Sequence, residues 1–134
     1  MISLDAAFAR IRRQKIEKFS GSSFVSPEEI LSKIPFMEMH SDQQLLFGVY
    51  ANEQKWTVLS VSYLFAMYGG AFSCLQLDLE TRKIFEYFSG NDFSANLHLE
   101  DGRKIWFKSE ELCSLILNVM LMLEKVPCGT ILEK

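Results

Sequence analysis

The stretch from Ser109 to Lys125 reads Ser-Glu-Glu-Leu-Cys-Ser-Leu-Ile-Leu-Asn-Val-Met-Leu-Met-Leu-Glu-Lys, and it is the clearest helix in the sequence. Ser109 can accept a hydrogen bond from the first backbone amides, and the two acidic residues after it lie at the positive end of the helix dipole. Lys125 lies at the negative end, and Pro127 follows at a position where proline commonly comes after a helix. These features predict a helix that begins and ends within this stretch.

Apolar side chains cover almost the whole circumference of this predicted helix. One face carries them at helical spacing: Leu112, Leu115, Ile116, Val119 and Leu123. Others widen that stripe: Cys113, Leu117, Met120, Leu121 and Met122. Because such a helix must be nearly surrounded, we expect it to plug an open antiparallel sheet or barrel. If the chain instead forms a homodimer, Leu117, Met120 and Leu121 are the candidate dimer face.

Length and composition indicate a single domain over residues 1–134. Of these 134 residues, 49% are hydrophobic and 23% are charged, which suits an ordinary core. No uncharged apolar run approaches the roughly 20 residues that span a bilayer, and the N-terminus lacks the pattern of a signal peptide. We therefore expect a soluble, cytoplasmic protein.

The net charge, the three cysteines and the two histidines limit the classes of function that the sequence supports. The formal net charge is -3, which argues against nucleic-acid binding because that normally requires a basic face. Cys74, Cys113 and Cys128 lack metal-ligand spacing and indicate thiols in a reducing compartment. His40 and His98 have no ligand partner three or four residues away. The sequence thus predicts no metal, no cofactor and no catalytic residue, so we do not expect an enzyme.

Residues 4–19 are predicted to form a first helix that carries the one basic cluster of the chain. Its apolar sector holds Leu4, Phe8, Ile11 and Phe19. Four basic residues are candidates for contact with an anionic partner: Arg10, Arg12, Arg13 and Lys18. The candidate partners are an acidic protein, an RNA or a lipid headgroup, the last giving peripheral membrane contact. The alternative is a solvated outer face on a docked helix.

The segment Ser26-Pro27-Glu28-Glu29 predicts the start of a second, short helix. Its serine is the N-cap, its proline takes the first helical position, and its second glutamate completes a capping box. The core face would be Ile30, Leu31 and Ile34, and Pro35 would end the helix. We interpret residues 1–36 as a helical attachment to the rest of the domain.

From Gln44 onward the pattern changes to that of short strands. Residues 45–50 and 56–61 are predicted to pair across a turn at residues 52–54. The evenly apolar run that follows is also compatible with a buried helix. Its β-branched and aromatic content instead favours two strands broken near Ser62.

Two further strands are expected before the C-terminal hairpin. Three leucines alternate with polar residues in the pattern of a half-buried strand: Leu75, Leu77 and Leu79. Residues 83–88 follow as another strand, and residues 89–92 as its turn. With the hairpin, the total is about seven strands.

Asp101-Gly102 predicts a hairpin whose register follows from its pattern. A two-residue turn would set Leu99 against Lys104, an apolar residue against a polar one. A three-residue loop, Asp101 to Arg103, sets Leu99 against Ile105, and every partner then matches its face. The outer face would be an aromatic and basic binding surface, or would lie under the N-terminal helices: His98, Lys104, Trp106 and Lys108.

This order of strands and helix resembles the pleckstrin-homology (PH) superfold over roughly residues 44–125. Residues 56–65 are similar to the bacterial PH-like pattern, in which a strand runs into a Thr-Asp-x-Arg-Leu-x corner. Ser60, Val61 and Tyr63 stand at the Thr, Asp and Arg positions, and Leu64 matches. The resemblance implies an α+β fold with two N-terminal helices, a bent antiparallel sheet or partly open barrel of about seven strands, and a capping C-terminal helix.

The same resemblance implies a binding module without chemistry. Lipid-binding members carry several basic residues in the loop between the first two strands. The corresponding residues 51–55 hold one lysine beside one glutamate, which disfavours phosphoinositides. We therefore expect a protein or peptide partner, which could add along a strand edge.

Two alternatives come from other classes of protein. A small acidic chain with an apolar C-terminal helix also looks like a type III secretion chaperone, a homodimer that wraps an effector segment. Those chaperones place a helix between their strand groups, whereas only turns are predicted here. The composition also permits a bacterial immunity protein or antitoxin, which would use acidic patches to block a basic toxin.

Overall fold

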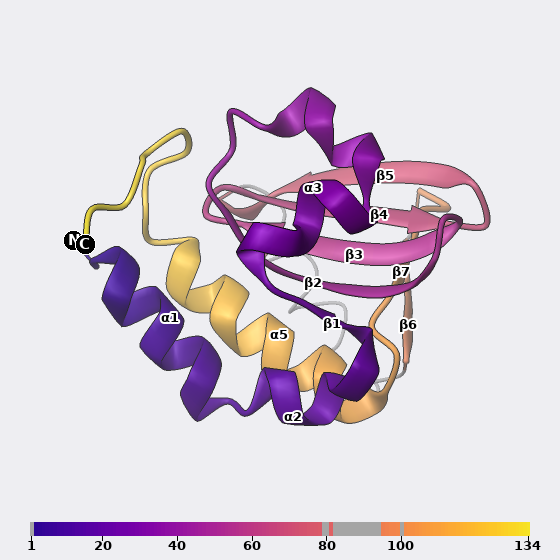
Figure 1. The fold of residues 1–134 in the computed structure, drawn as a ribbon, viewed down its shortest axis with the longest axis horizontal. Helices are drawn as coiled ribbons and strands as arrows, with labels where there is room; N and C mark the ends of the chain where they lie inside the picture. Colours follow the sequence, from indigo (N-terminus) through magenta and orange to yellow (C-terminus); the bar gives the residue numbers. More distant parts are fainter. Residues whose placement is uncertain (1, 79–80, 82–94, 100) are drawn as a thin grey trace.

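The structure is a computed structural model that describes residues 2–78, 81, 95–99 and 101–134. Five antiparallel strands form one sheet in the order β1-β2-β3-β4-β5, and β6 pairs with β7 separately (Figure 1). The strands are β1 (Phe24–Val25), β2 (Leu45–Asn52), β3 (Lys55–Ser60), β4 (Tyr63–Tyr68), β5 (Ala71–Gln76), β6 (Asn96–His98) and β7 (Lys104–Trp106). The predicted α+β class is confirmed, whereas the described strands do not close into a barrel.

Helical segments cover both faces of the five-stranded sheet (Figure 1). One face packs against α1 (Leu4–Arg13), α2 (Ile16–Ser20) and α5 (Glu110–Leu123), and we call it the helical face. The opposite face packs against α3 (Ile30–Lys33) and the 3-10 segment η3 (Pro35–His40), and we call it the aromatic face. Two further 3-10 turns, η1 (Gly21–Ser23) and η2 (Pro27–Glu29), flank β1. Among the described helices, none combines the length and hydrophobicity needed to cross a bilayer.

Helix α5 forms as predicted and lies in the larger core. The Ser109 hydroxyl accepts a hydrogen bond from the Leu112 amide at 3.2 Å, which caps the helix. Leu117 and Met120 are 1% and 0% exposed in this core, and Leu121 is half-buried. The prediction of a dimer face is therefore wrong for Leu117 and Met120, because both side chains are buried within this chain.

The predicted helix over residues 4–19 is broken into α1 and α2. Lys15 has a left-handed backbone with φ of 56°, which turns the chain between them. No glycine or proline marks this break in the sequence, and the apolar spacing continues across it. A single helix was predicted for this reason. Ile11 and Ile16 share the larger core with α5, whereas Phe19, which was predicted in the apolar sector, is 43% exposed and does not belong to this core.

The second predicted helix is shorter than expected and starts differently. A 3-10 turn follows Ser26, and α3 begins only at Ile30. The Ser26 hydroxyl donates to the Glu29 carboxylate at 2.8 Å and does not accept from an amide, while the Ser26 backbone amide also donates to that carboxylate. Only the glutamate half of the predicted capping box is therefore formed. Leu31, predicted as a core residue, is 43% exposed. Pro35 follows α3 as predicted.

The central strands confirm the predicted break near Ser62. β3 ends at Ser60 and β4 begins at Tyr63, and the Tyr63 amide donates to the Ser60 hydroxyl at 2.9 Å in the tight turn between them. The next strand was predicted too far along the chain, since β5 already begins at Ala71. β5 ends at Gln76, while Leu77 and Asp78 are helical.

Thr81 is also helical, and its hydroxyl donates to the Leu77 carbonyl four residues earlier, as in a helical turn. Leu77 and Thr81 are both buried, so the apolar leucines that suggested a strand also fit a helix face. Helical residues thus lie between the two groups of strands. Leu79 and the predictions for residues 83–88 and 89–92 fall outside the described residues.

The β6-β7 hairpin forms, but its register differs from the prediction. Leu97 lies opposite Ile105 and His98 opposite Lys104, a shift of two residues from the predicted pairs. A shift of two keeps every side chain on its face, so hydrophobic pattern does not distinguish the two registers. Gly102 has the expected positive φ, 91°.

The C-terminal tail and the β6-β7 hairpin complete the helical face. The chain ends lie side by side (Figure 1), where the Leu4 amide donates to the Glu133 carbonyl at 2.7 Å. The Gln44 side chain both donates to and accepts from the backbone of Leu132, at 3.0 and 2.7 Å. The Thr57 hydroxyl donates to the Trp106 carbonyl at 2.5 Å, which joins β7 to the larger sheet.

Candidate functional site

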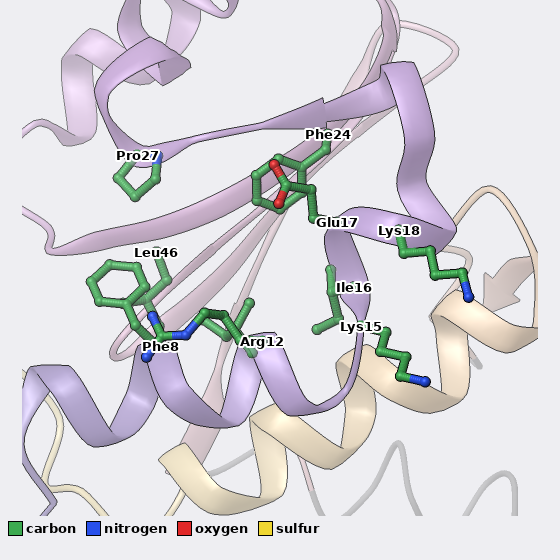
Figure 2. A pocket seen from close by; sticks show the side chains of 10 residues that line it. Phe8, Arg12, Lys15, Ile16, Glu17, Lys18, Phe24, Pro27 and Leu46 are labelled. Carbon is green, nitrogen blue, oxygen red and sulfur yellow. The ribbon is translucent and has the colours of Figure 1, made fainter.

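A groove of 280 Å³ lies between the N-terminal helices and the start of the five-stranded sheet (Figure 2). We call it the α1–α2 groove. Its lining comes from α1, α2, β1, η2 and β2: Phe8, Ile11, Arg12, Lys15, Ile16, Glu17, Lys18, Phe24, Pro27 and Leu46. Five separate elements therefore build one concave surface.

The apolar floor of the groove follows from how these elements pack. Ile11 and Ile16 are 6% and 0% exposed, so α1 and α2 are both anchored in the larger core beneath it. The Phe24 ring stacks on Phe47 at 6.1 Å between centroids, which fixes β1 at the edge of the sheet. β1 pairs with Gly48 and Val49 of β2, and Leu46 lies beyond the end of this short pairing. The groove occupies the space that a longer edge strand would have filled.

The charged groups of the groove differ in direction (Figure 2). Arg12 extends toward Phe8 and Leu46, and the Glu17 carboxylate points toward the Phe24 ring. Lys15 and Lys18 extend away from the other labelled side chains. Arg12 therefore brings positive charge to the apolar floor, while the two lysines contribute mainly their aliphatic stems.

The predicted basic cluster is only partly assembled at this groove. Arg12 and Lys18 line it, as does Lys15, which was not among the predicted contact residues. Arg13 is exposed but is not part of the lining. Arg10 is half-buried, and its Nε atom has no hydrogen-bond partner in the described part of the chain.

In the second predicted surface, His98, Lys104 and Trp106 share one face of the hairpin, whereas Lys108 is engaged elsewhere. His98 and Lys104 are exposed opposite each other, and Trp106 is half-buried against the core. Lys108 has a positive φ of 73°, and its ammonium group donates to the Ser20 carbonyl. Lys108 thus ties the chain before α5 to the end of α2, which is a structural contact.

The aromatic face has a groove of its own, with a volume of 330 Å³. It is lined by Lys33, Ile34, Pro35, Phe36, Tyr50, Glu53, Trp56 and Met67. The Phe36 ring lies 4.8 Å from Phe72 and 5.9 Å from Trp56, centroid to centroid. His40 joins the same cluster at 4.7 Å from Phe65. This face therefore holds a cluster of rings in tilted contact, whereas most of the buried side chains on the helical face are aliphatic.

Among the residues that the structure describes, three titratable groups have shifted pKa values. The Cys128 thiol hydrogen-bonds the Tyr63 hydroxyl at 3.5 Å, and this contact together with burial raises the pKa of Tyr63 to about 12. The amide and guanidinium of Arg103 lower the pKa of Asp101. Hydrogen bonds from Ser26 lower the pKa of Glu29. None of these groups lines the α1–α2 groove, and the described residues contain no cluster of His, Cys, Asp and Glu able to hold a metal ion.

Comparison with known proteins found no matching family model, no matching curated protein and no matching solved structure. The case for a function therefore depends on the geometry of this chain.

Sequence reasoning missed most of the apolar half of the α1–α2 groove. Phe24, Pro27 and Leu46 come from three elements and have no shared spacing in the sequence. The basic residues were found because they cluster on one segment, a pattern that is visible before folding. Only the packing of β1 beside α1 and α2 reveals the surface they border.

Proposed function

We propose that this chain is a non-catalytic binding module that holds a segment of a protein partner in the α1–α2 groove. The observation that carries the proposal is the concave apolar surface with Arg12 at its edge, built from five elements. Protein interfaces commonly combine a buried apolar anchor with charged groups around it.

The size of the groove supports a peptide side chain as its occupant. At 280 Å³ it lies just below the range of about 300–1,000 Å³ typical of small-molecule sites. Phe8, Phe24 and Leu46 offer apolar contacts, and Arg12 offers a bidentate donor to a carboxylate. The expected segment therefore presents one or two large apolar residues flanked by an acidic residue.

A peptide library displayed on phage tests this proposal. Selection on the intact chain should enrich apolar residues next to Asp or Glu, and the selected peptides are then measured by calorimetry. Arg12→Glu should weaken binding by about tenfold or more, because the new carboxylate would repel the acidic residue of the peptide. Phe8→Ala should weaken it through lost apolar contact.

Arg13→Glu is the matched control, because Arg13 neighbours Arg12 on α1 but does not line the groove. It makes the same change of charge and should alter affinity by less than about threefold. Equal losses for the two arginine variants would show that general charge, and not the groove, attracts the peptides. Failure to enrich any sequence, alongside tight binding to anionic liposomes, would replace the proposal with membrane contact.

A second candidate is a homodimeric chaperone resembling those of type III secretion. Helical residues Leu77, Asp78 and Thr81 lie between β5 and β6, where those chaperones place a helix. The absence of such a helix was the objection drawn from the sequence, so this observation favours the candidate. The PH-like alternative draws support from the apolar α5 packed on an antiparallel sheet, while this inserted helical segment counts against it.

Sedimentation equilibrium separates these candidates. A homodimer at micromolar concentration is expected for the chaperone, since its function requires two copies. A strict monomer would discard the chaperone and leave the peptide-binding module standing.

A further inference from the structure

Two lysines from different sheets converge on the ring of Tyr68. The Lys55 ammonium lies 5.9 Å from the ring centroid, and the Lys104 ammonium lies 5.7 Å from it. Lys55 is the direct partner of Tyr68 across β3 and β4, whereas Lys104 begins β7. Each distance is within the range of a cation–π contact, so one ring contacts two ammonium groups.

These two charges have no carboxylate partner among the residues that the structure describes. A hollow of 270 Å³ adjoins the ring and is lined by Phe72, Ser73, Asp101, Gly102, Arg103 and Lys104, with Tyr68 and Ala71. Its one carboxylate, Asp101, is engaged by Arg103 at 2.6 Å. The site therefore keeps positive charge in a chain whose formal net charge is -3.

We propose that this Tyr68 site docks an acidic segment of a partner protein, with a Glu or Asp carboxylate received by Lys55 and Lys104. A carboxylate near the Tyr68 ring would attract both ammonium groups while each cation keeps its ring contact. Tyr68 and Phe72 supply flat apolar surface for the rest of the segment. No residue lines both this hollow and the α1–α2 groove, so the two sites are separate.

An acidic peptide fits this site better than a nucleic acid or a phosphate. Two uncompensated cations are few for a polyanion, whose binding depends on neutralising many phosphates. Asp101 also lies in the hollow and would repel a doubly charged phosphate more strongly than a single carboxylate.

Fluorescence anisotropy with a labelled hexaglutamate peptide at low ionic strength tests the proposal. Lys55→Gln and Lys104→Gln should each weaken binding by roughly threefold, and the double variant by roughly tenfold. Tyr68→Leu should also weaken it, because it removes the ring that gathers the two lysines. Added salt should reduce binding to the wild-type chain.

The double variant Lys33→Gln and Lys125→Gln is the matched control, since it removes two exposed lysines outside this site. Its affinity should stay within about twofold of wild type. An equal loss in the control, or no binding of hexaglutamate to the wild-type chain, would overturn the proposal. So would inorganic phosphate or phosphatidylserine vesicles that bind through Lys55 and Lys104 more tightly than the peptide does.

Discussion

The two faces of the five-stranded sheet are closed by very different elements. The helical face is covered by α5, a 14-residue helix with seven buried residues, together with α1 and α2. The aromatic face is covered by the 4-residue α3 and by η3, and three of their large apolar side chains are 37% to 69% exposed: Leu31, Phe36 and Met39. One face is sealed and the other is left partly open.

This difference shows that the length of a helix determines how completely it covers the face of a sheet. A long regular helix repeats its contact every three or four residues, so one apolar stripe covers a whole sheet face. Short segments change direction after each turn and leave gaps between them. The α1–α2 groove and the groove on the aromatic face both lie beside such short elements, namely α2, η2 and η3. Binding surfaces are therefore expected where coverage is interrupted.

The largest contrast should come from the same substitution on the two faces. Leu117→Ala, in the sealed core, should lower the free energy of unfolding by about 2–5 kcal/mol, because it leaves a cavity. Leu31→Ala, on the open face, should lower it by less than about 1 kcal/mol, since Leu31 is already 43% exposed. Urea titration measures both. Equal losses would mean that the two faces are equally tight.

Gly48→Ala measures how tightly the aromatic side of β2 is packed. An added Cβ would lie 3.2 Å from Val58 Cγ2 and 3.3 Å from the Thr57 carbonyl oxygen. Val58 is β-branched and fully buried, and a backbone oxygen does not move easily, so the substitution should destabilise the fold by about 1–3 kcal/mol. A neutral or stabilising result in thermal unfolding would show that this face has more room than its contacts suggest.

The two serines that begin helical segments should differ in a smaller way. Ser109→Ala removes the cap of α5 and should cost about 1 kcal/mol of stability. Ser26→Ala removes a hydroxyl that bonds only the exposed Glu29 side chain, so we expect a change within about 0.5 kcal/mol. The pKa of Glu29 should also rise toward its ordinary value, which NMR titration would detect. A larger loss of stability for Ser26→Ala than for Ser109→Ala would contradict this prediction.

The smallest effect concerns Tyr63, where the C-terminal tail meets the aromatic face. Its ordinary pKa is 10.0 and its pKa here is about 12, so the native state favours the protonated phenol. The stability from this contact is complete below pH 10 and is lost as the pH rises toward 12. Ultraviolet titration, with Tyr63→Phe to assign the signal, should place its midpoint near 12. Cys128→Ala should lower that midpoint, and an unchanged value would remove the thiol as the cause.

Local patterns predicted the elements that carry their own start and stop signals. The helix from Glu110 to Leu123 agrees with its cap and apolar stripe, and the break between β3 and β4 falls at Ser62 as expected. The errors occurred where two structures share one pattern. The hairpin register could shift by two residues without moving any side chain to the other face. Leu77 is buried as predicted, although it belongs to a helical segment.

The candidate sites divide in the same way. Arg12 and Lys18 were identified from charge clustering, and Lys104 from its place on the hairpin. Lys55 and Tyr68 were not linked to Lys104, because the contact joins strands of two different sheets. Lys108 was assigned to a binding surface, yet its ammonium group is bound to the Ser20 carbonyl. Residue type suggested these positions, and the packing of the chain determined which of these residues contact one another.

The sequence by itself determined the α+β class, the apolar C-terminal helix and the order of the central strands, since these depend on periodicity and capping within short windows. Only the tertiary structure decided that Lys15 breaks the first helix, that α5 has no free dimer face at Leu117 and Met120, and where the grooves lie. These features depend on contacts between residues far apart in the chain. The free energy of such contacts is set by which surfaces meet, and no local spacing encodes that.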